Sequence, residues 1–209
     1  MPYDPRAAGS RCDECALGGP FVVPKCVPPR GPPNARIAVV GEAPGANEVK
    51  KLEPMVGASG IKLDEILWEA GLTRAQVFIS NASLCRCEIP DREGPSRYSS
   101  EEYMKWLKKE NGRRATINKQ RKKQAKKDPT LQLVLEPMLV SPFDACRPRL
   151  LRELKWLDEQ ACAAGAPNGL AVMPLGNFAL RSLRGLTSIM KYRGSVMRGD
   201  DVLASAEGS

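Results

Sequence analysis

A short apolar run that breaks into a loop of glycine and proline constrains the fold more than any other part of this sequence. Residues 37–40 include two valines and an isoleucine, and Gly41 ends the run. Such a run predicts a buried central strand rather than a segment of helix. Open α/β sheets bind ligands where a loop leaves the carboxyl end of a strand, and the loop at 41–45 carries one carboxylate, Glu42. We therefore expect a ligand site beside Glu42, although a strand, turn and helix without chemistry would produce the same pattern.

Strand-like and helix-like segments alternate along the rest of the chain. A second turn of small residues at 54–60 leads into a helix expected from about Ser59 to Ala70, with Gly71 as its stop. This alternation predicts an α/β fold with a parallel sheet. The remaining segments are expected strands at 76–81 and 169–176, expected helices at 142–164 and 177–183, a short apolar element at 133–140, and a short edge strand at 21–24.

Asn81 ends the second predicted strand and should face the same crevice as Glu42, because parallel strands end at one edge of the sheet. Its amide can both donate and accept a hydrogen bond, as recognition of a base edge requires. The alternative is an asparagine that only forms the turn at the strand end.

The length and the absence of long apolar runs predict a soluble intracellular protein. The 209 residues suit one domain, spanning 1–209, and no run approaches the ~18 apolar residues of a membrane span. The amino terminus lacks the apolar stretch of a signal peptide. We therefore expect a cytoplasmic protein that makes no membrane contact.

Seven cysteines in an intracellular chain indicate metal or redox chemistry rather than disulfides. The chain has no histidine, which excludes zinc sites that use imidazole and a histidine general base. Cys12 and Cys15 form a CxxC pair, whose two thiolates can face one metal. A thioredoxin-like pair is the rival interpretation, but that motif should follow a strand and open a helix, whereas glycines flank this one.

The positive charge is concentrated in residues 103–127. Eleven lysines and arginines lie there against the single acid Glu110, a local charge of +10 in a chain whose total is +8. Such a segment is expected to be partly helical or disordered and to project from the fold. A solvated helix is the plain alternative, but this density favours contact with a phosphate backbone, without sequence preference. The residues expected to bind DNA here are Lys122, Lys123, Lys126 and Lys127.

Seven separate stretches resemble, in order, the family 4 uracil-DNA glycosylases, which are the iron–sulfur members of their superfamily. The stretches begin at the CxxC pair and continue with Val40-Gly41-Glu42-Ala43-Pro44-Gly45 with Glu48, Pro54-Met55-Val56-Gly57-x-x-Gly60, Asn81-x-x-x-Cys85-Arg86, Cys146-Arg147-Pro148, Pro174-Leu175-Gly176 and Ser188-Ile189-x-Lys191-x-Arg193-Gly194. The resemblance implies a three-layer αβα fold around a short, mostly parallel sheet.

The resemblance also implies a [4Fe–4S] cluster on four cysteines. The matching residues are Cys12, Cys15, Cys85 and Cys146, with Cys87 as a competitor for Cys85. A zinc site of four thiolates is the alternative, because sequence does not separate the two. Cys26 and Cys162 are expected to be plain thiols. The family has a short loop between the last two ligands, so about 88–142 is expected to be an insertion here.

The implied activity is hydrolysis of the N-glycosidic bond of deoxyuridine in DNA after the base is flipped from the stack. Glu42 matches the acid that positions water or stabilises the sugar cation, and Asn81 matches the asparagine that reads uracil. The residues that would line the pocket and contact nearby phosphates are Ala43, Pro44, Gly45, Met55 and Gly57. The residues expected near the DNA strand are Lys191, Arg193 and Gly194.

Two departures bear on activity. Met55 stands where the family usually has a phenylalanine that stacks on uracil, and the family's later His-Pro-Ser/Ala motif has no counterpart in a chain without histidine. We therefore expect the family's C-terminal strand to be missing from the sequence, and either that another polypeptide supplies it or that fast catalysis is lost. The sequence therefore leaves three hypotheses. The first is a slow or partner-dependent glycosylase. The second is a non-catalytic iron–sulfur DNA-binding module, for example one associated with a phage or bacterial DNA polymerase, and the third is a subunit that binds a nucleic-acid scaffold or an acidic partner. Each places the protein in the cytoplasm of a bacterial or phage-infected cell.

Overall fold

A parallel sheet of three strands organises the structure, a computed structural model that describes residues 3–18, 26–89, 99–197 and 199. The strands lie in the order β2-β1-β3, with β1 (Ile37–Gly41) between β2 (Val77–Asn81) and β3 (Ala171–Pro174). Both neighbours are parallel to β1. The predicted central strand and α/β class are confirmed.

The strand register brings the three carboxyl ends to one edge. Gly41 pairs with Asn81 on one side, and Val40 pairs with Pro174 on the other. The loops that leave β1 and β3 and the last residue of β2 therefore meet there, which is where parallel sheets place their ligand sites.

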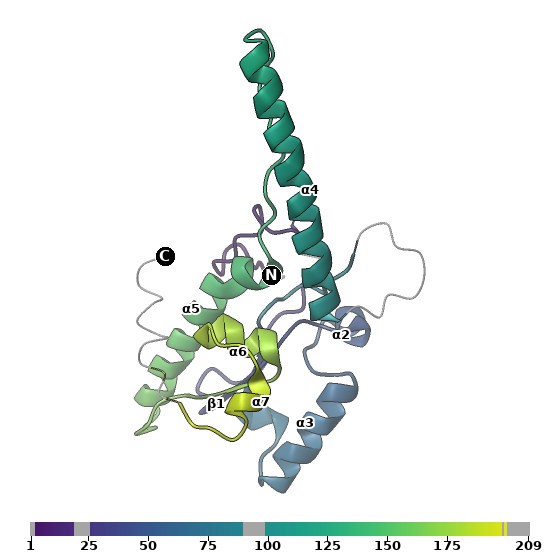
Figure 1. The fold of residues 1–209 in the computed structure, drawn as a ribbon. Coiled ribbons are helices and arrows are strands. Elements are labelled where there is room, and N and C mark those ends of the chain that lie inside the picture. Colours follow the sequence, from purple (N-terminus) through teal and green to yellow (C-terminus); the bar gives the residue numbers. More distant parts are fainter. Residues whose placement is uncertain (1–2, 19–25, 90–98, 198, 200–209) are drawn as a thin grey trace.

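Helices cover both faces of the sheet, which makes the three layers that the resemblance implied (Figure 1). Side chains alternate along β1, so Ala38 and Val40 face one core and Val39 faces the other. The helices are α2 (Ala46–Lys51), α3 (Ala58–Glu69), α4 (Ser100–Lys127), α5 (Pro142–Ala163), α6 (Asn177–Arg184) and α7 (Ile189–Tyr192), with a 3-10 turn at Arg74–Gln76.

The larger core lies beneath α4, α5 and α6. The predicted apolar stripe of α5, including Leu150, Leu154 and Leu157, packs there with Ala38 and Val40. The smaller core holds Leu63 and Leu67 of α3 against Val39 and Ile79, together with Met55. Each predicted helix is thus confirmed within a few residues, and its apolar face covers the sheet.

Three stretches differ from what the sequence predicted. A short helix, α2, follows the loop at 41–45, and α7 forms one turn after α6; neither was among the expected helices. The apolar element expected at 133–140 is neither helix nor strand, and its side chains are largely exposed, because it runs beside α4 rather than under the sheet. The edge strand expected at 21–24 lies outside the described residues.

The basic segment forms one continuous helix that stands away from the sheet (Figure 1). Ser99 caps α4 by accepting a hydrogen bond from the Glu102 N–H at 3.2 Å. Tyr103 and Leu107 are its buried residues and fix its base to the larger core. The 28-residue helix is about 42 Å long, so most of it extends beyond the core. Among the described residues, no helix is both long enough and apolar enough to cross a bilayer.

Candidate active site

Asn81 and Glu42 occupy neighbouring strand ends. Asn81 is the last residue of β2, and Glu42 follows Gly41, its partner in the register of β1. Asn81 is 1% exposed, whereas Glu42 is half-buried. The structure thus places the predicted amide and carboxylate at one edge of the sheet.

Gly41 lets Met55 and Asn81 approach the backbone of β1. A side chain at this position would collide with the Cε methyl of Met55 and with Oδ1 of Asn81, so only glycine leaves the room that both occupy. The Nδ2 amide group of Asn81 is buried and has no hydrogen-bond partner among the described residues. A buried donor without a partner costs free energy in the empty protein, so this N–H₂ group is suited to a carbonyl oxygen of a bound molecule.

Glu42 is held by the chain that follows β3. Its Oε1 accepts a hydrogen bond from the Phe178 N–H at 3.1 Å, at the first turn of α6. Gly176 adopts a left-handed φ of 102°, and an added Cβ there would collide with the Glu42 carboxylate. Oε2 of Glu42 has no partner among the described residues, so it remains able to bind water or face a cation.

Met55 sits in a loop whose backbone is held from both sides. It has φ of 55°, an unusual value for a residue other than glycine. Its N–H donates to Oε1 of Glu48 at 2.6 Å, and its carbonyl accepts from Arg74. The second oxygen of Glu48 accepts from the Gly45 N–H. Glu48 and Arg74 therefore position Met55 and the loop at Gly45; Glu48 belonged to a matching motif, but neither role was predicted.

A buried arginine supports the strand end that carries Asn81. Arg149 on α5 is 0% exposed, and its guanidinium donates to the carbonyl of Asn81 at 2.7 Å and to Oγ of Ser80 at 3.0 Å. It also pairs with Glu153 one turn later at 2.7 Å. Tyr3 donates to the other Glu153 oxygen at 2.6 Å, and burial, followed by the Glu153 carboxylate, raises the pKa of Tyr3. The opposite charges at 149 and 153, inside an apolar stripe, were the sequence signal that could have revealed this network.

The four cysteines predicted as ligands lie on segments that contact one another. Cys15 forms an isolated parallel bridge with Val140, shortly before Cys146 on α5. The backbones of Cys85 and Cys26 form an isolated antiparallel bridge. Cys26, which was expected to be a plain thiol, therefore lies beside a predicted ligand. The hydroxyl of Ser10 lies 3.7 Å from Sγ of Cys146.

Thiolates in this region would affect one another. Burial, and then the neighbouring Cys146, raises the pKa of Cys12 to about 11. Burial, partly offset by the Leu17 N–H, raises the pKa of Cys15 to about 12. Burial raises the pKa of Cys85 as well, and the other thiols add to the effect. Buried thiols whose pKa values nearby thiols raise further are donors that a cationic metal centre stabilises. However, no group of three or more cysteine, aspartate or glutamate side chains among the described residues is spaced to hold a metal ion.

The residues expected to contact DNA lie on two different elements. Lys191 is on α7 and Arg193 and Gly194 follow it, all exposed. This loop is tied to the start of α6, because the Ile189 N–H donates to Oδ1 of Asn177 at 2.7 Å. The other group, Lys122, Lys123, Lys126 and Lys127, is exposed on the outer half of α4.

Comparison with known proteins agrees with this arrangement. A model of the uracil DNA glycosylase superfamily matches residues 28–206, which includes all three strands and their carboxyl ends. The chain belongs to the uracil DNA glycosylase superfamily. Its resemblance to family 4 is confirmed by relatives that carry the name type-4 uracil-DNA glycosylase.

Three such relatives show how far the similarity extends. The protein of Pyrobaculum aerophilum is 36% identical over 96 residues, which cover 46% of this chain and 47% of that protein. The protein of Sulfurisphaera tokodaii is 52% identical over 61 residues, 29% of this chain and 28% of its own length. The protein of Archaeoglobus fulgidus is 44% identical over 70 residues, 34% of each chain. The matched part of this superfamily member thus spans less than half the length of each relative.

Proposed function

We propose that this protein removes uracil from DNA by hydrolysing the N-glycosidic bond of deoxyuridine. The buried, unpartnered Nδ2 of Asn81 carries the proposal. Uracil presents a carbonyl acceptor beside an N–H donor, and the amide of Asn81 offers the complementary pair. Met55 lies next to this amide and packs on the face of the base, which needs no specific polar contact.

Glu42 supplies the negative charge that the reaction requires. When the bond between the sugar C1′ and uracil N1 breaks, its electron pair leaves with the base and the sugar becomes cation-like. The unpartnered Oε2 of Glu42 faces this cation or orients the water that adds to C1′, and the water's proton is released as the sugar hydroxyl forms. The contacts at Gly176 and Phe178 hold the carboxylate in place, so that little reorganisation is needed.

Because these 209 residues contain no histidine, we expect slow turnover by this chain on its own. In this reaction the departing uracil carries negative charge. Removing a hydrogen-bond donor to such an oxyanion raises the activation free energy by about 3 to 4 kcal/mol. Among the side chains at this edge of the sheet, Asn81 is then the donor to the base. A strand of another chain could pair beside β3 and bring a further donor, because β3 pairs with β1 only among the described strands and Val172 on it is 37% exposed.

Excision assays with Asn81 variants test the proposal. We expect Asn81→Ala to lower the single-turnover rate of uracil release by about 100-fold or more, the effect of losing a preorganised donor. Asn34→Ala is the matched control, because Asn34 is exposed and precedes β1 at the opposite end of the sheet. Equal rates for the two variants would show that Asn81 does not read the base. No release by any form, with DNA binding retained, would favour a non-catalytic DNA-binding module.

We also propose that Cys12, Cys15, Cys85 and Cys146 hold a [4Fe–4S] cluster, with zinc as the alternative. The cysteine-bearing segments lie beside one another, and burial together with nearby thiols raises the pKa of Cys12 and Cys85, which supports this assignment. The thiols would draw closer together on binding the metal, because their spacing among the described residues suits none. When bound, the cluster would fasten the amino-terminal segment to α5 and to the chain after β2. Iron, sulfide and zinc analysis of anaerobically purified protein distinguishes the two. The metal should be lost in Cys12→Ser and kept in Cys162→Ser, whose thiol is exposed; equal metal content in both would refute the assignment.

A further inference from the structure

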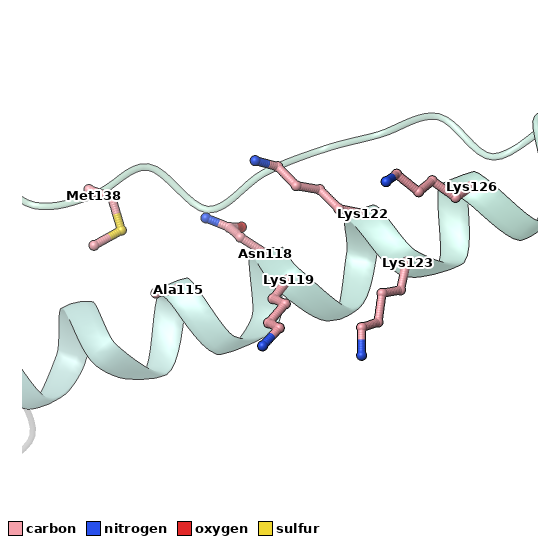
Figure 2. Close-up of a pocket in the computed structure, with 7 residues that line it drawn as sticks. All are labelled: Ala115, Asn118, Lys119, Lys122, Lys123, Lys126 and Met138. Atoms are coloured by element: carbon pink, nitrogen blue, oxygen red, sulfur yellow. The ribbon is translucent and has the colours of Figure 1, made fainter.

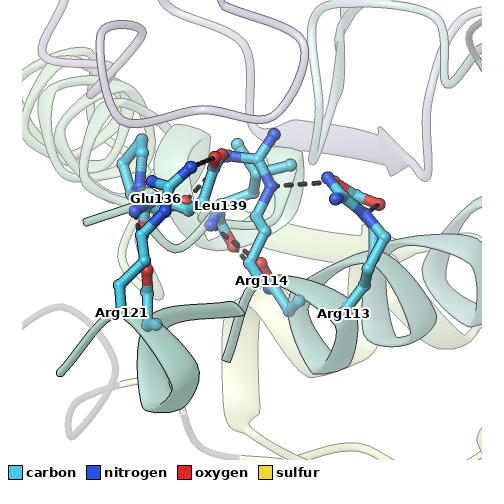
Figure 3. A network of polar contacts seen from close by, with 9 residues as sticks. Arg113, Arg114, Arg121, Glu136 and Leu139 are labelled. Atoms are coloured by element: carbon cyan, nitrogen blue, oxygen red, sulfur yellow. Dashed lines mark hydrogen bonds and ion pairs between the residues drawn. The ribbon is translucent and has the colours of Figure 1, made fainter. Parts of the chain in front are cut away.

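Two arginines of α4, Arg114 and Arg121, join the helix to the returning chain at 128–140, and we define these two segments together as the projecting arm. Arg114 pairs with Glu110 at 2.9 Å and donates to the Pro137 carbonyl at 2.9 Å. Arg121 donates to the Val134 carbonyl at 3.0 Å and pairs with Glu136 at 3.2 Å. Figure 3 shows Arg114 and Arg121 of the helix beside Glu136 and Leu139 of the returning chain. Guanidinium groups suit this role, because their fork binds carbonyls and carboxylates at once.

Two asparagines fasten the returning chain along the helix. The amide of Asn118 donates to the Glu136 carbonyl and accepts from the Glu136 N–H, at 2.8 and 2.7 Å. Asn111 does the same with Leu139, at 2.9 Å each way. Seven helical residues rise about 10 Å, and three extended residues span about the same length. The hydrogen bonds of Asn111 and Asn118 therefore form without strain, and they hold the helix and the returning chain together as one stiff unit.

The lysines of the outer arm are left without such partners. Lys119, Lys122, Lys123 and Lys126 are exposed and make no ion pair within the described part of the chain. Together with Ala115, Asn118 and Met138 they line a groove of about 480 Å³. In Figure 2, Lys122 and Lys126 lean toward the returning chain, whereas Lys119 and Lys123 point away from it.

We propose that this groove and its lysines form a second DNA-binding surface, which holds the sugar–phosphate backbone at a distance from the flipped nucleotide. The inference rests on the proposed function only in taking DNA as the substrate. Ammonium groups act as point charges and favour phosphate without reading bases. Lys119 and Lys126 are about 10 Å apart along the helix axis, which equals the rise of about three base pairs. An arm locked by its own arginines keeps this spacing when DNA binds.

The length of the arm determines how far along the DNA its lysines can contact phosphates. Leu107 is the last buried residue of α4, and Lys126 follows 19 residues later, which is about 28 Å along the axis. At 3.4 Å per base pair, the arm can reach phosphates up to about 8 base pairs from the body of the protein. DNA affinity should therefore depend on the length of the duplex on one side of the uracil site.

The test measures binding to duplex DNA without uracil, so it does not depend on catalysis. The variant is Lys122→Gln with Lys126→Gln, and the control is Arg36→Gln with Lys62→Gln, which removes the same charge from exposed positions away from the arm. We expect the arm variant to bind about 10-fold to 60-fold more weakly at 0.1 M salt, and to lower the slope of log affinity against log salt by about 2. Thermal unfolding of both variants should match that of the parent protein, because all four side chains are exposed.

Duplex length supplies the second readout. With the parent protein, the affinity per binding position should increase when the uracil-free duplex is lengthened from about 4 to about 12 base pairs, and this gain should vanish in the arm variant. An arm variant with the salt slope and length dependence of the control would overturn the proposal. Loss of uracil release with this binding pattern intact would instead count against the proposed function alone.

Discussion

Replacing Arg149 by methionine should destabilise the protein more than any surface substitution. The guanidinium is fully buried and contacts Glu153, Ser80 and the Asn81 carbonyl within 3.0 Å. Methionine fills similar space but leaves a carboxylate that is only 15% exposed without its partner. Breaking a buried pair in this way costs about 3–5 kcal/mol, which corresponds to a fall in Tm of about 10 °C for a chain of this size.

Thermal and urea unfolding measure this loss, with Arg181→Met on the exposed face of α6 as the control. The double variant Arg149→Met with Glu153→Leu should recover part of the stability, because no buried charge is then left unpaired. A single variant that loses less than about 1 kcal/mol, or a double variant less stable than the single, would refute the reasoning. Uracil excision should fall in both variants, since the Asn81 carbonyl loses its support.

Three further predictions concern the contacts around the site and the arm. Glu48→Gln weakens the acceptor of two loop N–H groups, so the KM for uracil-containing DNA should rise about 3-fold to 10-fold in steady-state assays, with kcat changed less; an unchanged KM would contradict it. Gly176→Ala forces a Cβ into the Glu42 carboxylate at a left-handed φ, and should lower the excision rate about 10-fold or more, whereas a fully active variant would exclude this contact from catalysis. Asn111→Ala with Asn118→Ala should make the returning chain the first site of limited proteolysis without changing the Tm of the core, and equal cleavage in parent and variant would show that the two asparagines do not hold it.

The strands and packed helices could be predicted because their apolar pattern is local. The run at 37–40 and the stripe of α5 each show their own periodicity, and the structure confirms both. The parallel register then places Asn81 beside Gly41 without further information.

What the sequence did not show depends on contacts between distant segments. Arg149 is fully buried because it binds the end of a strand that lies about seventy residues earlier in the chain. The residue type alone predicts a position at the surface. Residues 133–140 of the returning chain are as apolar as a core element, yet hydrogen bonds from Asn111 and Asn118 on α4 hold them at the surface. Such side-chain hydrogen bonds leave no periodic pattern to read.

Single-turnover release of uracil from a single-stranded oligonucleotide tests the central claim most directly. Anaerobically purified protein is compared with Glu42→Gln, and released base is detected by alkaline cleavage of the strand. We predict slow release by the parent protein and a loss of about 100-fold or more in the variant, because Glu42 is the carboxylate placed at the strand ends beside Asn81. Equal release by both proteins, or none by the parent protein while it still binds the oligonucleotide, would contradict the assignment of this edge of the sheet as a uracil-excising active site.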